Sequence, residues 1–222
     1  MVIIAGRRRE ALDEVTAANP GMASLVLDIE DAASITACAA SLATTHPALD
    51  AVIHNAGIMR PEAIRQGVVA DAEAMVATNL LGPIRLNAAL LPQLEQQASA
   101  TIVTVSSGLA FLPMATTPTY CATKAAIHSY TQSLRYQLRD TAVQVLELVP
   151  PYVQTELMGA HQANDPNAMP LQAFIDEVMQ RIDTAPDATE ILVERVKPLR
   201  FAESSGGYDA FFKQFNDAAA AH

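Results

Sequence analysis

Basic residues are scarce in this chain. Its 222 residues include 14 lysines and arginines against 24 aspartates and glutamates, a formal net charge of -10. Nucleic acids and anionic membranes attract basic surfaces, so this shortage argues against both kinds of partner. Cysteine is scarce too: Cys38 and Cys121 lie far apart, without the spacing of metal ligands. We therefore expect no metal site and reduced thiols, as in a cytoplasmic protein.

Long apolar runs and low-complexity tracts are also missing. No apolar run approaches the ~20 residues of a membrane span, and the apolar start at Met1–Ala5 is too short for a signal peptide. Half of the residues are hydrophobic, and the length suits one well-buried domain. We expect a single domain over residues 1–222, in which residues 158–222 form a substrate lid and C-terminal helices. The lid is expected to present an apolar wall to the substrate, made of Met158, Met169, Leu171, Phe174 and Met179.

Segments typical of strands and helices alternate along the chain. Strands are predicted at Val2–Ala5, Ser24–Leu27, Ala51–His54, Thr101–Val105 and Val143–Val149. Helices are predicted at Arg7–Ala18, Asp31–Thr45, Ala72–Leu91 and Thr119–Arg139. This alternation indicates an α/β fold with a parallel sheet that helices cover on both faces. Ligands bind at the carboxyl ends of such strands, where several polar or small residues follow directly: Asp28, Asn55-Ala56-Gly57, Ser107 and Pro150-Pro151.

Three of these side chains form a candidate proton-transfer group. Tyr120 and Lys124 are four residues apart and so share one helix face, and Ser107 ends a strand thirteen positions upstream. A free phenol has a pKa of about 10 and is a poor base at pH 7. A cation ~4 Å away offers about 4 kcal/mol at an effective dielectric of ~20, or roughly 3 pKa units. Lys124 is thus expected to bring Tyr120 close to working pH unless burial offsets the gain, while Ser107 holds a substrate oxygen; the alternative is an ordinary helix with an incidental Tyr and Lys.

Other residues suit a nucleotide ligand. Asn79 lies four residues before Pro83, which has no N–H for the Asn79 carbonyl and so leaves it free to hold a water; a tolerated kink is the alternative. Arg7 and Arg8 follow the first strand and suit a phosphate monoester, or simply begin a solvated helix. Asp28 either accepts a hydrogen bond from an adenine amine or caps a turn.

Taken together, these motifs resemble the short-chain dehydrogenase/reductases in their compact single-domain form. Asn79, Ser107, Tyr120 and Lys124 match the catalytic tetrad of that family, and Pro150–Thr155 resembles its nicotinamide-binding segment. His54–Gly57 is similar to its Asn-Asn-Ala-Gly element. More narrowly, three segments resemble the DltE-type branch of the family: Ser106–Phe111, Tyr120–Ala126 and Leu134–Arg139.

The resemblance implies a Rossmann-like, doubly wound parallel sheet and hydride transfer between a nicotinamide and a carbonyl or alcohol carbon. In reduction, Tyr120 would protonate the nascent alkoxide, Lys124 would also hold the nicotinamide ribose, and Asn79 would anchor a water linked to Lys124. Basic residues after the first strand favour NADP over NAD. The implied cofactor contacts are Arg7, Arg8, Asp28, Asn55, Ala56, Gly57, Tyr120, Lys124, Pro150, Val153 and Thr155. Because the helix at Thr119–Arg139 often pairs with its copy in this family, a homo-oligomer is also expected.

One element of the family pattern is missing from the sequence. No subset of the nine glycines has the Thr-Gly-x-x-x-Gly-x-Gly spacing of the pyrophosphate-binding turn, and the chain begins at what matches the family's second strand. We therefore expect the first β-α unit to be absent. The start codon lies too far downstream, or the gene is truncated, or the two flanking strands close together in an altered sheet. The alternative to an active oxidoreductase is a truncated or non-catalytic scaffold of the same fold.

Overall fold

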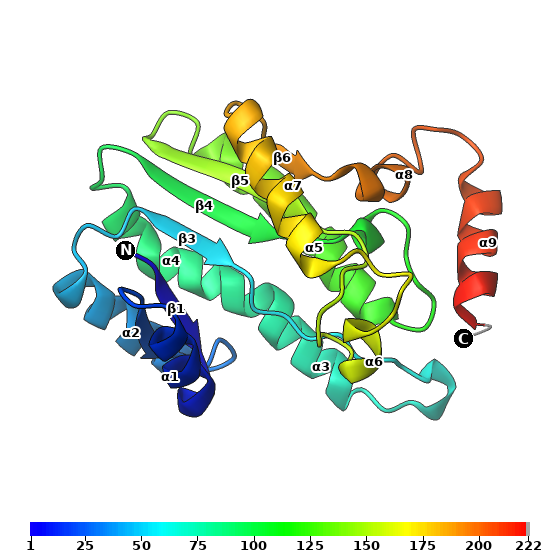
Figure 1. The fold of residues 1–222 in the computed structure, drawn as a ribbon, viewed down its shortest axis with the longest axis horizontal. Helices are drawn as coiled ribbons and strands as arrows, with labels where there is room; N and C mark the ends of the chain where they lie inside the picture. Colours follow the sequence, from blue (N-terminus) through cyan, green and yellow to red (C-terminus); the bar gives the residue numbers. More distant parts are fainter. Residues whose placement is uncertain (221–222) are drawn as a thin grey trace.

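The computed structural model describes residues 1–220 and contains two parallel β-sheets (Figure 1). The smaller sheet pairs β1 (Ile3–Gly6) with β2 (Ala23–Val26). The larger sheet has the order β3-β4-β5-β6, with bounds Ala51–His54, Ala100–Val105, Val143–Val149 and Glu190–Leu192. All its neighbouring strands run parallel. The predicted α/β class is confirmed, and β3 and β5 have the predicted bounds.

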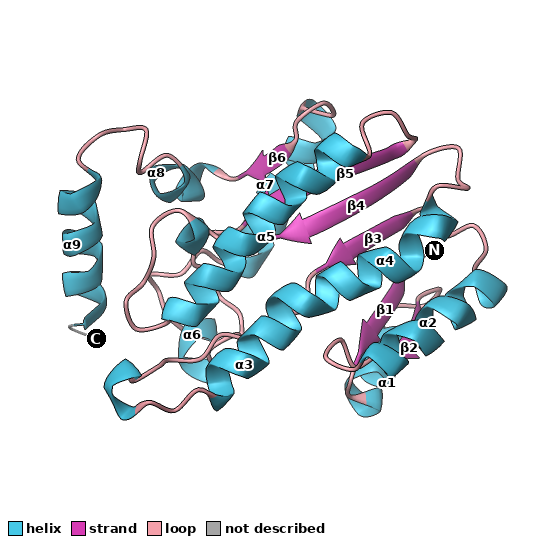
Figure 2. Ribbon diagram, turned by 180° about the vertical axis from the view of Figure 1, so that it is seen from behind, coloured by secondary structure: helices cyan, strands magenta, loops and turns pink. Residues whose placement is uncertain are grey.

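Helices cover the larger sheet unequally. Figure 2 shows α2 (Ala32–Thr45), α4 (Gly82–Leu94) and α5 (Pro118–Gln137) together on one face, whereas α7 (Leu171–Thr184) lies on the opposite face in Figure 1. The remaining helices are α1 (Arg9–Ala18), α3 (Ala70–Val76), α6 (Ala160–Ala163), α8 (Lys197–Arg200) and α9 (Tyr208–Ala220). Asp31 begins α2 as predicted, because its carboxylate accepts a hydrogen bond from the Ala33 N–H at 2.9 Å.

Two apolar clusters hold these layers together. The larger one joins strands β4 and β5 to α2 and α4, with Ile102, Leu90 and Leu94 almost completely buried. The second joins the end of β5 and β6 to α7 through Phe174 and Val178. These two clusters exclude water from the covered parts of the sheet. Strands β4 and β5 run from this core to the edge of the sheet where the candidate site lies.

The sheet is not continuous across the molecule. Among the described residues, β1 pairs only with β2 and β3 pairs only with β4, so the two facing edges share no ladder. The idea that the flanking strands close together is therefore wrong. The chain opens with a β-α unit of its own, β1 and α1, and the absence of an earlier unit is not something this structure shows. Beside the gap, Ile53 of β3 is 63% exposed.

One long helix, Ala70–Leu94, passes through the centre of the fold. Residues Ala70–Leu94 form 25 helical residues, and an 18-residue window within them has a mean hydropathy of 1.3, so the helix is long and apolar enough to cross a membrane by length and composition alone. The sequence has no uninterrupted apolar run of this length, because Asp71, Glu73 and Arg85 lie within it; the helix is long because α3 and α4 are continuous through a π-helical turn at Ala77–Leu81. In the apolar window of this helix, 44% is buried inside the protein. Leu90 packs in the larger apolar cluster, and Met75 packs in the cluster that contains Tyr120. The packing of these residues makes this long helix a core helix of the fold.

Gly82 allows this long helix to lie close to Ile29, which follows β2 of the smaller sheet. A Cβ at Gly82 would lie 2.5 Å from Ile29 Cγ1 and 2.7 Å from the Ile29 carbonyl oxygen. We expect Gly82→Ala to lower the free energy of unfolding by about 1–3 kcal/mol, since the backbone of Ile29 must shift. Urea unfolding checks this. Gly6→Ala is the control, because its Cβ would meet only Leu12 at an ordinary 3.8 Å; equal losses for both variants would contradict the account.

Candidate active site

Tyr120, Lys124 and Ser107 come together where β4 ends. Tyr120 and Lys124 lie in the first two turns of α5, and each is 6% exposed. The Lys124 ammonium is 5.6 Å from the centroid of the Tyr120 ring and donates a hydrogen bond to the Val105 carbonyl at 2.8 Å. The side chain of Ser107 hydrogen-bonds the phenol. The spacing in the sequence therefore produces the predicted juxtaposition in space.

Burial controls the protonation of this group. It raises the pKa of Tyr120 to about 12, although the hydrogen bond from Ser107 acts in the opposite direction. Burial also lowers the pKa of Lys124 from 10.5 to about 8. The expectation that Lys124 brings Tyr120 to working pH does not hold for the unliganded site, because desolvation is the larger effect. At neutral pH the site thus presents a protonated phenol beside an ammonium, which is an arrangement suited to giving a proton.

Asn79 ties this group to the loop that follows β3. It lies in the π-helical turn, 2% exposed. Its amide oxygen accepts from the Ile58 N–H and its amide nitrogen donates to the Ile58 carbonyl, both at 2.9 Å. The same nitrogen donates to Thr123 Oγ1 at 3.2 Å. Sequence reasoning considered the Asn79 carbonyl, whereas the structure shows the side chain as the group that joins the loop to α5.

The small residues after β3 also reach the site. Asn55 and Ala56 are exposed, and a Cβ on Gly57 would lie 3.7 Å from Lys124 Nζ and 3.5 Å from Asn79 Oδ1. His54, by contrast, is buried and pairs with Asn87 at 2.6 Å, so it faces α4 rather than the site. The exposed backbone of this loop therefore borders the Tyr120 and Lys124 group.

The segment after β5 lies beside Ser107. The Pro150 carbonyl accepts a hydrogen bond from the Gly108 N–H at 3.0 Å. Val153 is buried, and its carbonyl and the Thr155 hydroxyl both accept from the Gln162 amide, at 2.8 and 3.2 Å. Gln162, which the sequence gave no reason to select, thus holds this segment in place from α6.

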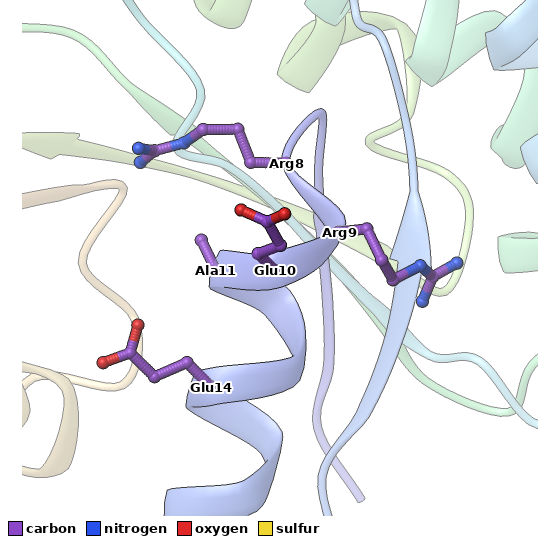
Figure 3. A pocket seen from close by; sticks show the side chains of 5 residues that line it. All are labelled: Arg8, Arg9, Glu10, Ala11 and Glu14. Atoms are coloured by element: carbon purple, nitrogen blue, oxygen red, sulfur yellow. The ribbon is translucent and has the colours of Figure 1, made fainter.

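Arg7, Arg8 and Asp28 lie apart from this group, on the smaller sheet. Arg7 approaches Glu30 at 3.5 Å, and the Asp28 carboxylate accepts from the Glu30 N–H at 3.0 Å, as in a capped turn. Arg8 precedes α1 and borders an open hollow of about 460 Å³ (Figure 3). The side chains of Arg8 and Arg9 point to opposite sides of the start of α1. Among residues 1–220 no hydrogen bond or salt bridge joins Arg7, Arg8 or Asp28 to Tyr120, so the structure divides the predicted site into two parts.

The apolar surroundings of Tyr120 differ from the predicted lid. Met169 and Phe174 belong to the core beneath α7, and Leu171 and Met179 are 48% and 52% exposed. Only Met158 of the predicted wall packs against the cluster that contains Tyr120. The partly buried side chains around that cluster are Ile58, Leu109, Met114 and Met158. Helix α7 packs Phe174 and Val178 onto the sheet, so this side of it covers the fold.

Comparison with known proteins identifies the family. A family model described as short chain dehydrogenase matches residues 1–166, three quarters of the chain. The chain belongs to the short-chain dehydrogenase family. It is 36% identical to the uncharacterized oxidoreductase DltE of Bacillus subtilis (strain 168), over 97% of this chain and 86% of that protein. The family and the likeness to DltE are thus as the motifs predicted.

Solved structures support the same fold. A short-chain dehydrogenase from Streptomyces avermitilis superposes with a TM-score of 0.81 at 22% identity, covering 100% of this chain and 88% of its own. The closed form of a serine dehydrogenase, solved with NADP+, is 27% identical with a TM-score of 0.74, over 86% of this chain and 82% of its own. This short-chain dehydrogenase therefore has the Rossmann-like fold of a family of oxidoreductases.

Proposed function

We propose that this protein reduces a carbonyl group with NADPH, or oxidises the corresponding alcohol with NADP+. The observation that carries the proposal is the buried contact between Tyr120 and Lys124, with Ser107 hydrogen-bonded to the phenol. A protonated phenol at neutral pH suits the direction of reduction, because the reaction then requires a proton donor at the carbonyl oxygen. The relatives' activity as oxidoreductases agrees with this chemistry.

Each residue of the group has a proposed role. Ser107 donates a hydrogen bond to the substrate oxygen and holds it beside the phenol. Tyr120 gives its proton to that oxygen as negative charge develops on it. Lys124 stabilises the tyrosinate that remains, since a nearby cation favours the charged form of a phenol. Asn79 acts at a distance, because its amide keeps α5 and the loop after β3 in register.

The residues present fit the nicotinamide half of NADP(H). Asn55, Ala56 and Gly57 offer exposed or partly exposed backbone next to Lys124, where a flat ring and its ribose need close approach. We place Pro150, Val153 and Thr155 on the other side of the nicotinamide. When bound, the cofactor supplies the hydride. Lys124 also has donors to spare for ribose hydroxyls, since among the described residues the Val105 carbonyl takes only one of its three hydrogens.

The adenosine half is proposed to lie across the smaller sheet. Asp28 would accept from the adenine amine, and Arg7 and Arg8 would pair with the 2′-phosphate, which favours NADP over NAD. Within residues 1–220 no Gly-rich turn opens a helix to cradle the pyrophosphate. We propose that a strand-turn-helix segment outside this sequence fills the gap between β1 and β3. The unpaired edges of those strands and the exposed Ile53 support this.

The substrate is proposed to be apolar next to its carbonyl. Thioether and aliphatic side chains, among them Met114 and Met158, surround the Tyr120 cluster. Two charged residues of the nearby loop already have partners, because Arg60 pairs with Asp71 and Glu62 is hydrogen-bonded to Thr119. Serine is the alternative substrate to test, because a serine dehydrogenase is among the similar solved structures.

A titration with NADPH, followed by carbonyl-dependent loss of absorbance at 340 nm, tests the proposal. We expect enhanced nicotinamide fluorescence and faster turnover of hydrophobic ketones and aldehydes than of sugars, or of serine with NADP+. Binding without turnover of any carbonyl would favour the scaffold. Binding that appears only after the upstream in-frame codons are included would support the proposed segment; no binding by either form would contradict the cofactor assignment.

Two further expectations stay predictions. The resemblance predicts a homo-oligomer in which α5 pairs with its copy, but Ile127 on this helix and Leu138 directly after it are buried in the core of the chain itself. Any pairing must therefore use other side chains, and sedimentation measures it directly. A cytoplasmic location likewise stays a prediction; both cysteines are buried and free.

A further inference from the structure

Glu62 contacts helix α5 at Thr119, the residue directly before Tyr120. Its two carboxylate oxygens accept hydrogen bonds from the backbone N–H and the hydroxyl of Thr119, each at 2.8 Å. Its own N–H donates to the Thr116 carbonyl at 2.9 Å. Glu62 therefore holds the two segments together at three points, although it is 57 residues away from Thr119 in the sequence.

The surroundings of Glu62 show that this contact is specific. Every residue at positions 61–70 is exposed except Glu62, which is half-buried. Within the described chain no basic side chain pairs with its carboxylate. Glu62 thus anchors this otherwise exposed part of the loop, and its side chain is directed at the N-terminus of α5.

Helix α5 needs this partner because its own cap is unused. Thr117, at the N-cap position, makes no capping hydrogen bond, and its hydroxyl lies 3.8 Å from Cys121 Sγ. The first N–H groups of a helix have no partner inside the helix, and a carboxylate at this end also complements the helix dipole. Glu62 supplies both effects from a distant loop.

We propose that Glu62 is a positioning residue: it docks the loop after β3 onto the first turn of α5 and so fixes Tyr120 relative to the cofactor side of the site. The inference rests on the proposed function for its catalytic consequence. The same loop begins with Asn55–Gly57, the backbone placed beside the nicotinamide. Glu62 therefore couples the segment proposed to hold the cofactor to the helix that carries the acid.

Two variants separate position from charge. Glu62→Ala removes the contact, and we expect kcat to fall about tenfold, because small displacements of a catalytic group are costly, while the Kd for NADPH changes less than about twofold. Glu62→Gln keeps an acceptor for the Thr119 N–H and a donor for its hydroxyl, so it should retain most of kcat. The control is Glu73→Ala, an exposed glutamate in the first turn of α3.

The pH profile gives a second readout for Glu62→Gln. The ionisable groups on α5 near this contact are Tyr120, Cys121 and Lys124, and Arg60 of the same loop pairs with Asp71 of α3. Removing a negative charge lowers the pKa of a phenol and of an ammonium alike. We expect the alkaline limb of kcat to move to lower pH by a few tenths of a unit, an effect that loosened packing alone does not predict.

Hydrogen exchange tests the docking without any turnover. We expect the amides of Thr119, Tyr120 and Cys121 to exchange at least about tenfold faster in Glu62→Ala than in the wild type or Glu73→Ala. Unchanged exchange and unchanged kcat in Glu62→Ala would overturn the inference. If the wild type reduces no carbonyl, the proposed function fails, and the exchange result still decides whether Glu62 holds α5.

Discussion

Replacing Tyr120 with Phe is expected to lower the rate of carbonyl reduction by about 10³-fold, since a positioned general acid typically contributes 10²–10⁴-fold. The ring stays, so the cluster around Met59 and Met75 keeps its packing. Only the hydroxyl that meets Ser107 is lost. Stopped-flow measurement of NADPH oxidation at a saturating carbonyl concentration gives the rate.

The same helix offers a matched control for this change. Tyr136 is 68% exposed on α5, so Tyr136→Phe should reduce carbonyls at the wild-type rate. The Kd for NADPH should stay within about threefold of the wild-type value in both variants. A Tyr120→Phe protein that kept more than a tenth of the wild-type rate would remove the acid role from this phenol.

Replacing Lys124 with Met is expected to stabilise the protein while it removes activity. Burial lowers the pKa of Lys124 from 10.5 to about 8, which at neutral pH corresponds to a folding cost on the order of 3 kcal/mol. Met has a similar shape and no charge to desolvate, although the hydrogen bond to Val105 is lost. We expect the free energy of unfolding at pH 7 to rise by about 1–3 kcal/mol.

The pH dependence of that gain follows from the sign of the shift. Between pH 8 and 10.5 the unfolded chain binds the Lys124 proton and the folded chain does not, so the wild type gains stability from this group as pH rises. The advantage of Lys124→Met should therefore be greatest below pH 8 and vanish by about pH 10.5. Urea unfolding across this range measures it. Lys213→Met, at a side chain that is 77% exposed, is the control, and an equal gain there would refute the burial argument.

Local patterns predicted the elements of the fold well. Ala51–His54 and Val143–Val149 are apolar runs bounded by turn residues, and the strands have those bounds. Strand β6 escaped prediction because Glu190–Leu192 is only three residues long and begins with a charge. The division into two sheets could not be predicted, because strand pairing depends on contacts between distant segments.

The candidate site was predicted in part for the same reason. Tyr120 and Lys124 are one helical turn apart, so their juxtaposition follows from local geometry. Burial affects the pKa of Tyr120 more than the Lys124 charge does. This follows from the packing around Tyr120, which the sequence does not show. The contact of Glu62 with Thr119 spans two loops, and no local motif marks it.

The most direct test of the account is whether a hydride passes from the nicotinamide to a carbonyl carbon. NADPH carrying deuterium at both C4 positions is mixed with the purified protein and a hydrophobic ketone, and the alcohol is analysed by mass spectrometry. We predict an alcohol that contains one deuterium with the wild type, and about 10³-fold less of this product in the same time with Tyr120→Phe. Unlabelled alcohol, or labelled alcohol formed equally by both proteins, would contradict the assignment of Tyr120 as the acid of an NADPH-dependent reductase.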